Sequence, residues 1–122
     1  METTDLKEIL NVANKQNLVI IGHMGSGKSI FGKKLANNFN VSHIDSDKEI
    51  IKFEKSSIND IFLIKGEDYF REIETKIVLK ILNRKNVIIS LGGGSVLNKN
   101  IRNKLKKKSY TIFLDVDLSI LN

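Results

Sequence analysis

The eight residues from Gly22 to Ser29, Gly-His-Met-Gly-Ser-Gly-Lys-Ser, constrain the fold of this chain more than any other segment. They fit the pattern Gly-x-x-x-x-Gly-Lys-Ser/Thr, whose glycines let backbone N–H groups turn inward around phosphates. A short apolar run at 17–21 precedes them and apolar residues at helical spacing follow, which predicts a strand, a loop and a helix in that order. The segment therefore predicts a phosphate-binding site, because a turn that merely ends a strand has no need of a lysine followed by a serine.

The side chains of this loop have different roles in the predicted site. In loops of this pattern the lysine reaches the β- and γ-phosphates, and the hydroxyl that follows it ligates Mg²⁺. Here these residues are Lys28 and Ser29. The positive end of the helix dipole adds to the attraction for an anion. We expect ATP to be bound by Gly25, Ser26, Gly27, Lys28, Ser29 and Ile30. His23 occupies a variable position of the pattern and is assigned no role.

Apolar runs alternate with amphipathic stretches along the rest of the chain. Strands are predicted at 17–21, 41–44, 87–91 and 110–114. Helices are predicted at 4–15, 28–38, 48–55, 67–82 and 98–107, with Thr3 or Thr4 as the cap of the first and a further short helix capped by Ser57 before a break at Gly66. This alternation predicts an α/β fold with a parallel sheet and right-handed crossovers. A chain of 122 residues is expected to form one domain.

Composition excludes several classes of protein. There is no cysteine, so disulfides and thiolate metal sites are impossible. The chain has no apolar run of 18 residues and no secretory leader pattern, so we expect a cytoplasmic protein without a membrane partner. The net charge of +6 is densest at 102–108. That run lacks interleaved aromatic residues, and we interpret it as a solvated helix face and not as a nucleic-acid site.

Two predicted strands end in residues suited to chemistry. Asp45 and Asp47 follow the second strand, and Gly92-Gly-Gly94 follows the third. Ligands of parallel sheets bind beyond the carboxyl ends of the strands, where the phosphate loop also lies. Phosphoryl transfer needs a carboxylate near Mg²⁺ and a group that orients the attacking hydroxyl. The alternatives are a helix cap with a first-turn acid for the aspartates, and a flexible turn for the glycines.

Arg71 and Glu74 form a further candidate pair. They lie three residues apart on a predicted helix and can pair on one face. A guanidinium held in this way can grip a carboxylate with two hydrogen bonds. The alternative is a surface ion pair, which stabilises little. His43 is interpreted as a strand-end residue, without partners for metal or triad chemistry.

Four elements occur in order: Gly-x-x-Gly-x-Gly-Lys-Ser, Asp-x-Asp, Gly-Glu-x-x-Phe-Arg-x-x-Glu and Leu-Gly-Gly-Gly. Together they resemble the shikimate kinase family over roughly residues 17–118. The resemblance implies a three-layer fold of the P-loop NTPase type, similar to nucleoside monophosphate kinases. It also implies transfer of the γ-phosphate of ATP, with Mg²⁺, to the 3-hydroxyl of shikimate, on the route to chorismate and the aromatic amino acids.

The resemblance assigns a role to each motif residue. Lys28 would contact phosphates, Ser29 and Asp45 would hold Mg²⁺, and Asp47 would bind the shikimate hydroxyls as candidate base. Arg71 would bind the shikimate carboxylate. The catalytic residues would thus be Lys28, Asp47 and Arg71, and the substrate would be bound by Asp47, Arg71, Gly92, Gly93, Gly94, Phe62, Phe70 and Glu74, the last of which orients the arginine.

The chain departs from the family pattern at both ends. Residues 1–16 would be an additional helical extension before a kinase domain at 17–122. That domain would have four strands and would lack the fifth strand and the lid, so we expect weak or absent transfer and an exposed edge beside 110–114. A monomer is expected. The alternatives are a relic that binds nucleotide or shikimate without transferring phosphate, another P-loop metabolite kinase such as a gluconate kinase, and a nucleic-acid binder.

Overall fold

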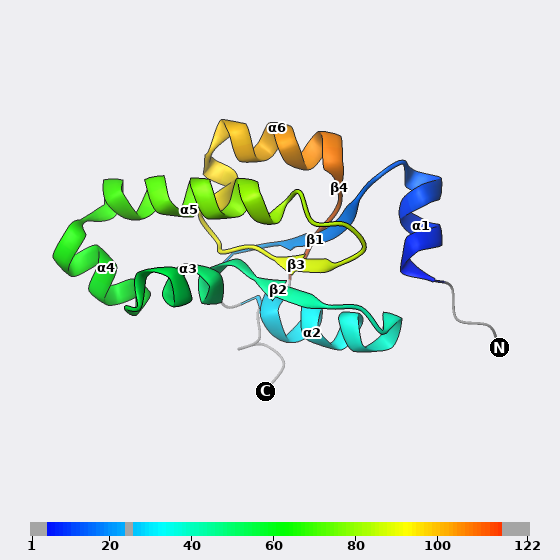
Figure 1. Ribbon diagram of the computed structural model, residues 1–122, viewed down its shortest axis with the longest axis horizontal. Helices are drawn as coiled ribbons and strands as arrows, with labels where there is room; N and C mark the ends of the chain where they lie inside the picture. Colours follow the sequence, from blue (N-terminus) through cyan, green and yellow to red (C-terminus); the bar gives the residue numbers. More distant parts are fainter. Residues whose placement is uncertain (1–4, 24–25, 116–122) are drawn as a thin grey trace.

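The computed structural model describes residues 5–23 and 26–115, and within them it forms a four-stranded parallel sheet (Figure 1). The strands are β1 (Asn17–Ile21), β2 (His43–Asp45), β3 (Ile88–Ser90) and β4 (Ser109–Phe113), in the order β2-β3-β1-β4. The helices are α1 (Leu6–Ala13), α2 (Lys28–Phe39), α3 (Ser46–Glu54), α4 (Ile58–Lys65), α5 (Glu67–Ile81), α6 (Lys99–Lys108) and the 3₁₀ turn η1 (Ser95–Leu97). The predicted α/β class is confirmed.

The two faces of the sheet are covered by different helices. Successive strand residues point to opposite faces. Leu18 and Ile20 therefore pack in a cluster with residues of α1 and α2, whereas Val19 and Ile89 pack in a cluster with residues of α5 and α6. Figure 1 shows α5 and α6 above the strands and α2 below them. The result is three layers, with the sheet buried in the middle.

Most predicted element boundaries are confirmed to within two residues. β1 has the predicted bounds, α2 begins at Lys28, and Ser57 caps α4 by accepting a hydrogen bond from the Asp60 N–H at 3.1 Å. Gly66 ends α4 with a φ of 91°, a conformation that favours glycine.

One local prediction was wrong, one helix start is shifted by two residues, and one turn was missed. The cap of α1 is Asp5, whose Oδ1 accepts from the Lys7 N–H at 3.1 Å, and neither Thr3 nor Thr4, which lie outside the described residues. α3 begins at Ser46 and not at residue 48, because Asp45 caps it. The 3₁₀ turn at 95–97 was not predicted.

α1 packs into the same core as the sheet. Its Leu6 and Leu10 are buried in a cluster with Leu18 and Ala36. The boundary between 1–16 and 17–122 stays a prediction, although the packing is continuous across it. None of the described helices is long and apolar enough to span a bilayer.

A buried polar cluster ties the amino end of the sheet to the α5–β3 connection. Asn17 is fully buried, and its Nδ2 donates to the carbonyl oxygens of Leu82 at 2.9 Å and Arg84 at 2.8 Å. Its Oδ1 accepts from the Ser109 hydroxyl at 2.6 Å. Buried polar groups are costly unless they are paired, so this cluster fixes where β1, β4 and the connection meet.

β4 forms an edge of the sheet within the described residues. It pairs with β1 along its whole length and has no second partner there. Tyr110 is 43% exposed and Phe113 is 60% exposed. The predicted edge beside 110–114 is therefore present in this part of the chain, and an exposed apolar edge favours association.

Candidate active site

The phosphate loop lies between the carboxyl end of β1 and the start of α2. Gly27 has a φ of 83° and immediately precedes Lys28, the first residue of α2. Ser26 is buried, and its hydroxyl has no hydrogen-bond partner among the described residues. An unpaired buried hydroxyl is unfavourable, so a phosphate oxygen here would satisfy it. Gly25 of the predicted set lies outside the described residues.

The Lys28 ammonium contacts a backbone carbonyl oxygen and is influenced by the charges of two carboxylates. Its Nζ donates to the His23 carbonyl oxygen at 3.1 Å. Burial lowers the pKa of Lys28, and the negative charges of Asp47 and Asp45 partly oppose that effect. A partly desolvated ammonium gains from a nearby anion, and this favours the predicted contact with phosphates.

Asp45 uses its two oxygens for two purposes. Oδ1 accepts from the backbone N–H groups of Asp47 at 2.9 Å and Lys48 at 3.2 Å, which makes Asp45 the N-cap of α3. Oδ2 accepts from the Ser29 hydroxyl at 2.6 Å. The cap interpretation is therefore confirmed, yet the second oxygen faces the phosphate loop.

Ser29 and Asp45 fit a magnesium ion by their chemistry. Hydroxyl and carboxylate oxygens are hard ligands, and Mg²⁺ usually takes few protein ligands besides water and substrate phosphates. The described residues contain no group of three or more histidine, cysteine or acidic side chains that would hold a metal without such help. The pair suits an ion that arrives with a nucleotide.

Asp47 lies among both anionic and cationic side chains. Burial raises the pKa of Asp47, and the nearby charges of Asp45 and Glu74 raise it further, whereas Lys28 and Arg71 lower it. Such a mixture of cationic and anionic neighbours marks a functional carboxylate. Asp47 therefore lies within electrostatic reach of the phosphate loop on one side and of the Arg71–Glu74 pair on the other.

The Arg71–Glu74 pair is not a surface ion pair. Nη1 of Arg71 donates to Oε1 of Glu74 at 2.8 Å, and the Glu74 side chain is only 4% exposed. Oε2 of Glu74 accepts from the Ser95 hydroxyl at 3.2 Å. The guanidinium carbon also lies 5.3 Å from the centre of the Phe70 ring. These contacts fix the guanidinium. The Arg71 side chain remains 37% exposed, so a ligand can reach it.

Of the two predicted aromatic residues, Phe70 lies against the Arg71 guanidinium and Phe62 packs on Phe70. The rings of Phe62 and Phe70 lie 4.7 Å apart between centres, tilted by 34°. Phe70 is buried in a small cluster with Ile50 and Ile61, against which Phe62 packs. Phe70 reaches the site through the Arg71 guanidinium, and its contact with a substrate stays a prediction.

The triple-glycine segment lies against both functional side chains. A Cβ on Gly92 would lie 2.5 Å from Oδ1 of Asp47, and a Cβ on Gly94 would overlap Nη1 of Arg71. The N–H of Gly92 donates to the buried Ser46 hydroxyl at 2.9 Å. The segment is thus held against the site and is no loose turn.

Sequence reasoning missed two hydroxyl residues that support the site. Ser46 holds the Gly92 backbone, and Ser95 holds Glu74. Each directly adjoins a motif, one between the two aspartates and one after the glycines. A small hydroxyl residue next to a motif at a strand end is the signal that would have found them.

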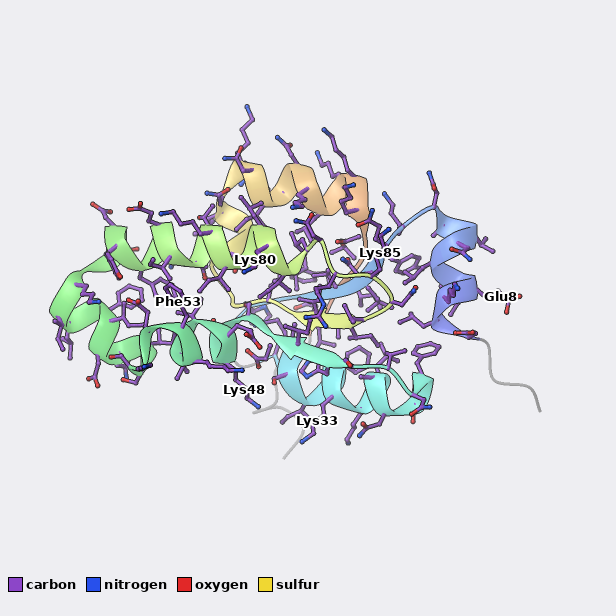
Figure 2. The ribbon with its side chains drawn as sticks, in the orientation of Figure 1. Glu8, Lys33, Lys48, Phe53, Lys80 and Lys85 are labelled. Carbon is purple, nitrogen blue, oxygen red and sulfur yellow. The ribbon has the colours of Figure 1, made fainter. Side chains whose placement is uncertain are left out.

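His43 is the first residue of β2, and it is half-buried. Burial lowers the pKa of His43, with Asp45 raising it and Lys48 and Lys33 lowering it. The two lysines extend from α3 and α2 along the lower side of the view in Figure 2. His43 is therefore expected to be neutral near neutral pH.

Replacement of Gly94 by alanine is expected to weaken substrate binding without unfolding the protein. The new Cβ overlaps the end of the flexible Arg71 side chain, which can move aside. The displaced guanidinium weakens its bond to the buried Glu74, so the free energy of unfolding should fall, by no more than the usual cost of overpacking, about 1–3 kcal/mol. KM for the acceptor should rise. Leu97→Ala, at a residue that is 75% exposed, is the control; an unchanged KM in Gly94→Ala would contradict the placement of Arg71.

The fold and the site define a class of protein. A phosphate loop after the first strand of a parallel sheet, with a serine–aspartate pair beside it, is the arrangement of the P-loop nucleotide-binding proteins.

Comparison with known proteins narrows this class to a family. The family described as shikimate kinase matches residues 24–122. The shikimate kinase of Sulfurihydrogenibium sp. is 44% identical over 85% of this chain, and that of Bartonella quintana is 36% identical over 94%. The chain therefore belongs to the shikimate kinase family. It spans 63% and 55% of the length of these two relatives.

Solved structures agree with this assignment. Shikimate kinase from Acinetobacter baumannii, in complex with shikimate, superposes with a TM-score of 0.82 at 30% identity, covering 87% of this chain and 59% of that one. Shikimate kinase from Aquifex aeolicus gives 0.78 at 37% identity, covering 86% and 62%. The predicted family and fold are thus confirmed.

Proposed function

We propose that this protein transfers the γ-phosphate of ATP to the 3-hydroxyl of shikimate. Family membership supports the reaction class. The observation that carries the proposal is that Asp47 and Arg71 lie against one glycine segment, since a Cβ on Gly92 would lie 2.5 Å from Oδ1 of Asp47 and a Cβ on Gly94 would overlap Nη1 of Arg71. The charge of Lys28, at the phosphate loop, also lowers the pKa of Asp47. A carboxylate between a phosphate-binding cation and a carboxylate-binding guanidinium suits an acceptor that has both a hydroxyl and a carboxylate.

On the donor side, the chain supplies positive charge and backbone donors. The N–H groups at the start of α2, the Lys28 ammonium and the buried Ser26 hydroxyl would bind the phosphates of ATP. Ser29 and Asp45 would hold Mg²⁺, which supplies neutralisation of the charge that develops on the transferred group. The Lys28 ammonium would stabilise the same charge.

On the acceptor side, the chain orients one hydroxyl. Arg71, held by Glu74, would bind the shikimate carboxylate, and the backbone of 92–94 would pack against the ring. Asp47 would then accept a hydrogen bond from the hydroxyl and take its proton as the bond to phosphorus forms. The bond between the γ-phosphorus and the bridging oxygen of ATP would break in the same step. ADP would leave with that oxygen, the phosphoryl group would end on the shikimate oxygen, and the proton would end on an Asp47 oxygen.

The test is release of ADP from Mg·ATP by the chain, with shikimate, with gluconate and with neither. Release should depend on shikimate, should be absent with gluconate, and should stop when EDTA removes Mg²⁺. Calorimetry with shikimate is run in parallel on the same folded sample.

We also propose that the protein is a monomer and acts in the cytoplasm, where ATP and Mg²⁺ are available. Analytical sedimentation tests whether it is a monomer.

Each other outcome selects a different function. Binding of shikimate without release of ADP would indicate the binding-only alternative. Release with gluconate would indicate another metabolite kinase. No binding of either acceptor by a folded sample would overturn the proposal.

A further inference from the structure

A three-way hydrogen-bonded joint lies beside the phosphate loop. Ser90, on β3, donates its hydroxyl proton to the carbonyl oxygen of Lys28 at 2.9 Å. The same Ser90 oxygen lies 2.9 Å from Nε2 of His43, on β2. Because Lys28 is the first residue of α2, the joint ties α2, β2 and β3 together at one point.

The chemistry of a hydroxyl fixes which way these hydrogen bonds run. A serine hydroxyl has one proton to donate and lone pairs to accept. The Ser90 proton goes to the Lys28 carbonyl, so the contact with His43 needs a proton on Nε2 of the imidazole. The joint therefore runs from His43 to Ser90 to the backbone of Lys28, and it selects the Nε2–H tautomer.

α2 has a glycine at the position where the two side chains of the joint pack against it. Gly32 is buried on α2, one turn after Lys28. A Cβ there would lie 2.7 Å from Nε2 of His43 and would overlap the Ser90 hydroxyl. Glycine weakens a helix relative to alanine, so its presence here is explained by the space that the two side chains occupy.

The joint connects the two sides of the proposed reaction. His43 lies two residues before Asp45, and Ser90 lies two residues before Gly92. The start of α2 holds the donor phosphates in the proposed function, whereas the segments after β2 and β3 hold the metal and the acceptor. A misplacement of reacting groups by about 1 Å can cost 10²-fold in rate, so a fixed joint among these elements has catalytic value.

We propose that His43 and Ser90 are positioning residues that align the phosphate loop with the acceptor side of the site, acting through the Lys28 backbone. This inference rests on the proposed function. Neither side chain is assigned a contact with ATP, Mg²⁺ or shikimate. Their effect is on the relative placement of α2, β2 and β3.

Ser90→Ala removes both hydrogen bonds of the joint, whereas His43→Phe removes the one that orients the Ser90 hydroxyl and leaves its bond to Lys28 possible. In Ser90→Ala we expect kcat/KM to fall about tenfold, as an alignment defect of a fraction of an ångström predicts, and in His43→Phe we expect a smaller fall. Affinity for a fluorescent ADP analogue should fall too, because the start of α2 is no longer held. The double variant should be no worse than Ser90→Ala alone, since without the Ser90 hydroxyl His43 has no bond left to lose in this joint. His43→Gln, whose amide can still donate to Ser90, should recover most of the loss.

Ser109→Ala is the matched control. It also removes a buried serine hydroxyl that bonds a polar side chain, Asn17, but at the opposite end of the strands. This variant should lose stability while its ADP affinity and kcat/KM stay at the wild-type values. A purely structural role for Ser90 would make the two serine variants alike.

Nuclear magnetic resonance of the imidazole nitrogens separates this inference from the proposed function. The wild-type chain should show the Nε2–H tautomer of His43, and Ser90→Ala should lose that preference, whether or not the protein phosphorylates shikimate. A protonated Nδ1 with an unprotonated Nε2 in the wild-type chain would overturn the joint. Wild-type ADP affinity in both Ser90→Ala and His43→Phe would overturn the positioning role.

Discussion

Asp47→Asn is expected to lower kcat by about 10²–10⁴-fold, the usual contribution of a general base. Asparagine keeps the shape of the side chain and its place against Gly92, but its amide cannot take the hydroxyl proton. KM for both substrates should change much less than kcat. The measurement is steady-state ADP release with each substrate varied, and a kcat within a few-fold of the wild type would remove Asp47 from the base role.

The same substitution is expected to stabilise the folded protein at neutral pH. Burial first, and then the charges of Asp45 and Glu74, raise the pKa of Asp47 above its ordinary 3.8. Between that value and the raised pKa, the folded state binds more protons than the unfolded chain. The free energy of unfolding therefore decreases as pH rises through this interval. Asparagine carries no charge, so the Asp47→Asn variant does not undergo this decrease in the free energy of unfolding.

Denaturant unfolding at several pH values measures the effect. The gain in stability of Asp47→Asn should be full above the raised pKa and should vanish below pH 3.8, where the wild-type carboxyl is also neutral. Asp68→Asn, on the exposed first turn of α5, is the control and should show no such gain. Equal stability of Asp47→Asn and the wild type at neutral pH would mean that the carboxylate is not strained.

Arg71→Ala is expected to raise KM for shikimate strongly, because it removes the group proposed to bind the substrate carboxylate. Truncating one partner of a hydrogen-bonded charge pair costs about 2–5 kcal/mol in affinity. Arg71→Lys should recover only part of this, since an ammonium cannot make two parallel hydrogen bonds to a carboxylate. KM for ATP should stay nearly constant, and a rise confined to ATP would contradict the assignment.

Stability reports on the same substitution independently. Arg71→Ala leaves the buried Glu74 carboxylate with only the Ser95 hydroxyl of its two observed partners. The expected loss is about 1–3 kcal/mol, reduced from that of a fully buried pair because Arg71 is itself 37% exposed. Adding Glu74→Gln should restore the stability but not the affinity for shikimate. Recovery of both the stability and the shikimate affinity would mean that Arg71→Ala weakens shikimate binding by disturbing the fold.

Local patterns in the sequence predicted the elements well, because their causes are local. The apolar run at 17–21, the glycine pattern before Lys28 and the hydroxyl of Ser57 each act within a few residues. The alternation of strands and helices then predicted that the motifs meet at the carboxyl edge of a parallel sheet, and the family resemblance assigned a role to each residue. Each of these signals is a short contiguous stretch of the chain.

Contacts between distant residues could not be predicted in the same way. His43 and Ser90 are 47 residues apart, and Ser90 and Lys28 are 62 apart. Periodicity gives the face on which each side chain lies, but not the partner that packing brings to it. The divided role of Asp45 also needed coordinates, because a capping aspartate and a metal-binding aspartate have the same signature in sequence.

That divided carboxylate narrows the choice of amino acid at position 45. One oxygen ends a helix and the other meets the Ser29 hydroxyl. Asparagine and serine cap helices well but bring no negative charge, and glutamate brings the charge but is not among the preferred caps. Under the proposed function, aspartate alone meets both demands, so each of these three replacements should impair the site. A divalent ion held by Oδ2 would share the carboxylate whose Oδ1 accepts from the Asp47 N–H, so the metal site and the first turn of α3, where Asp47 lies, would depend on the same side chain.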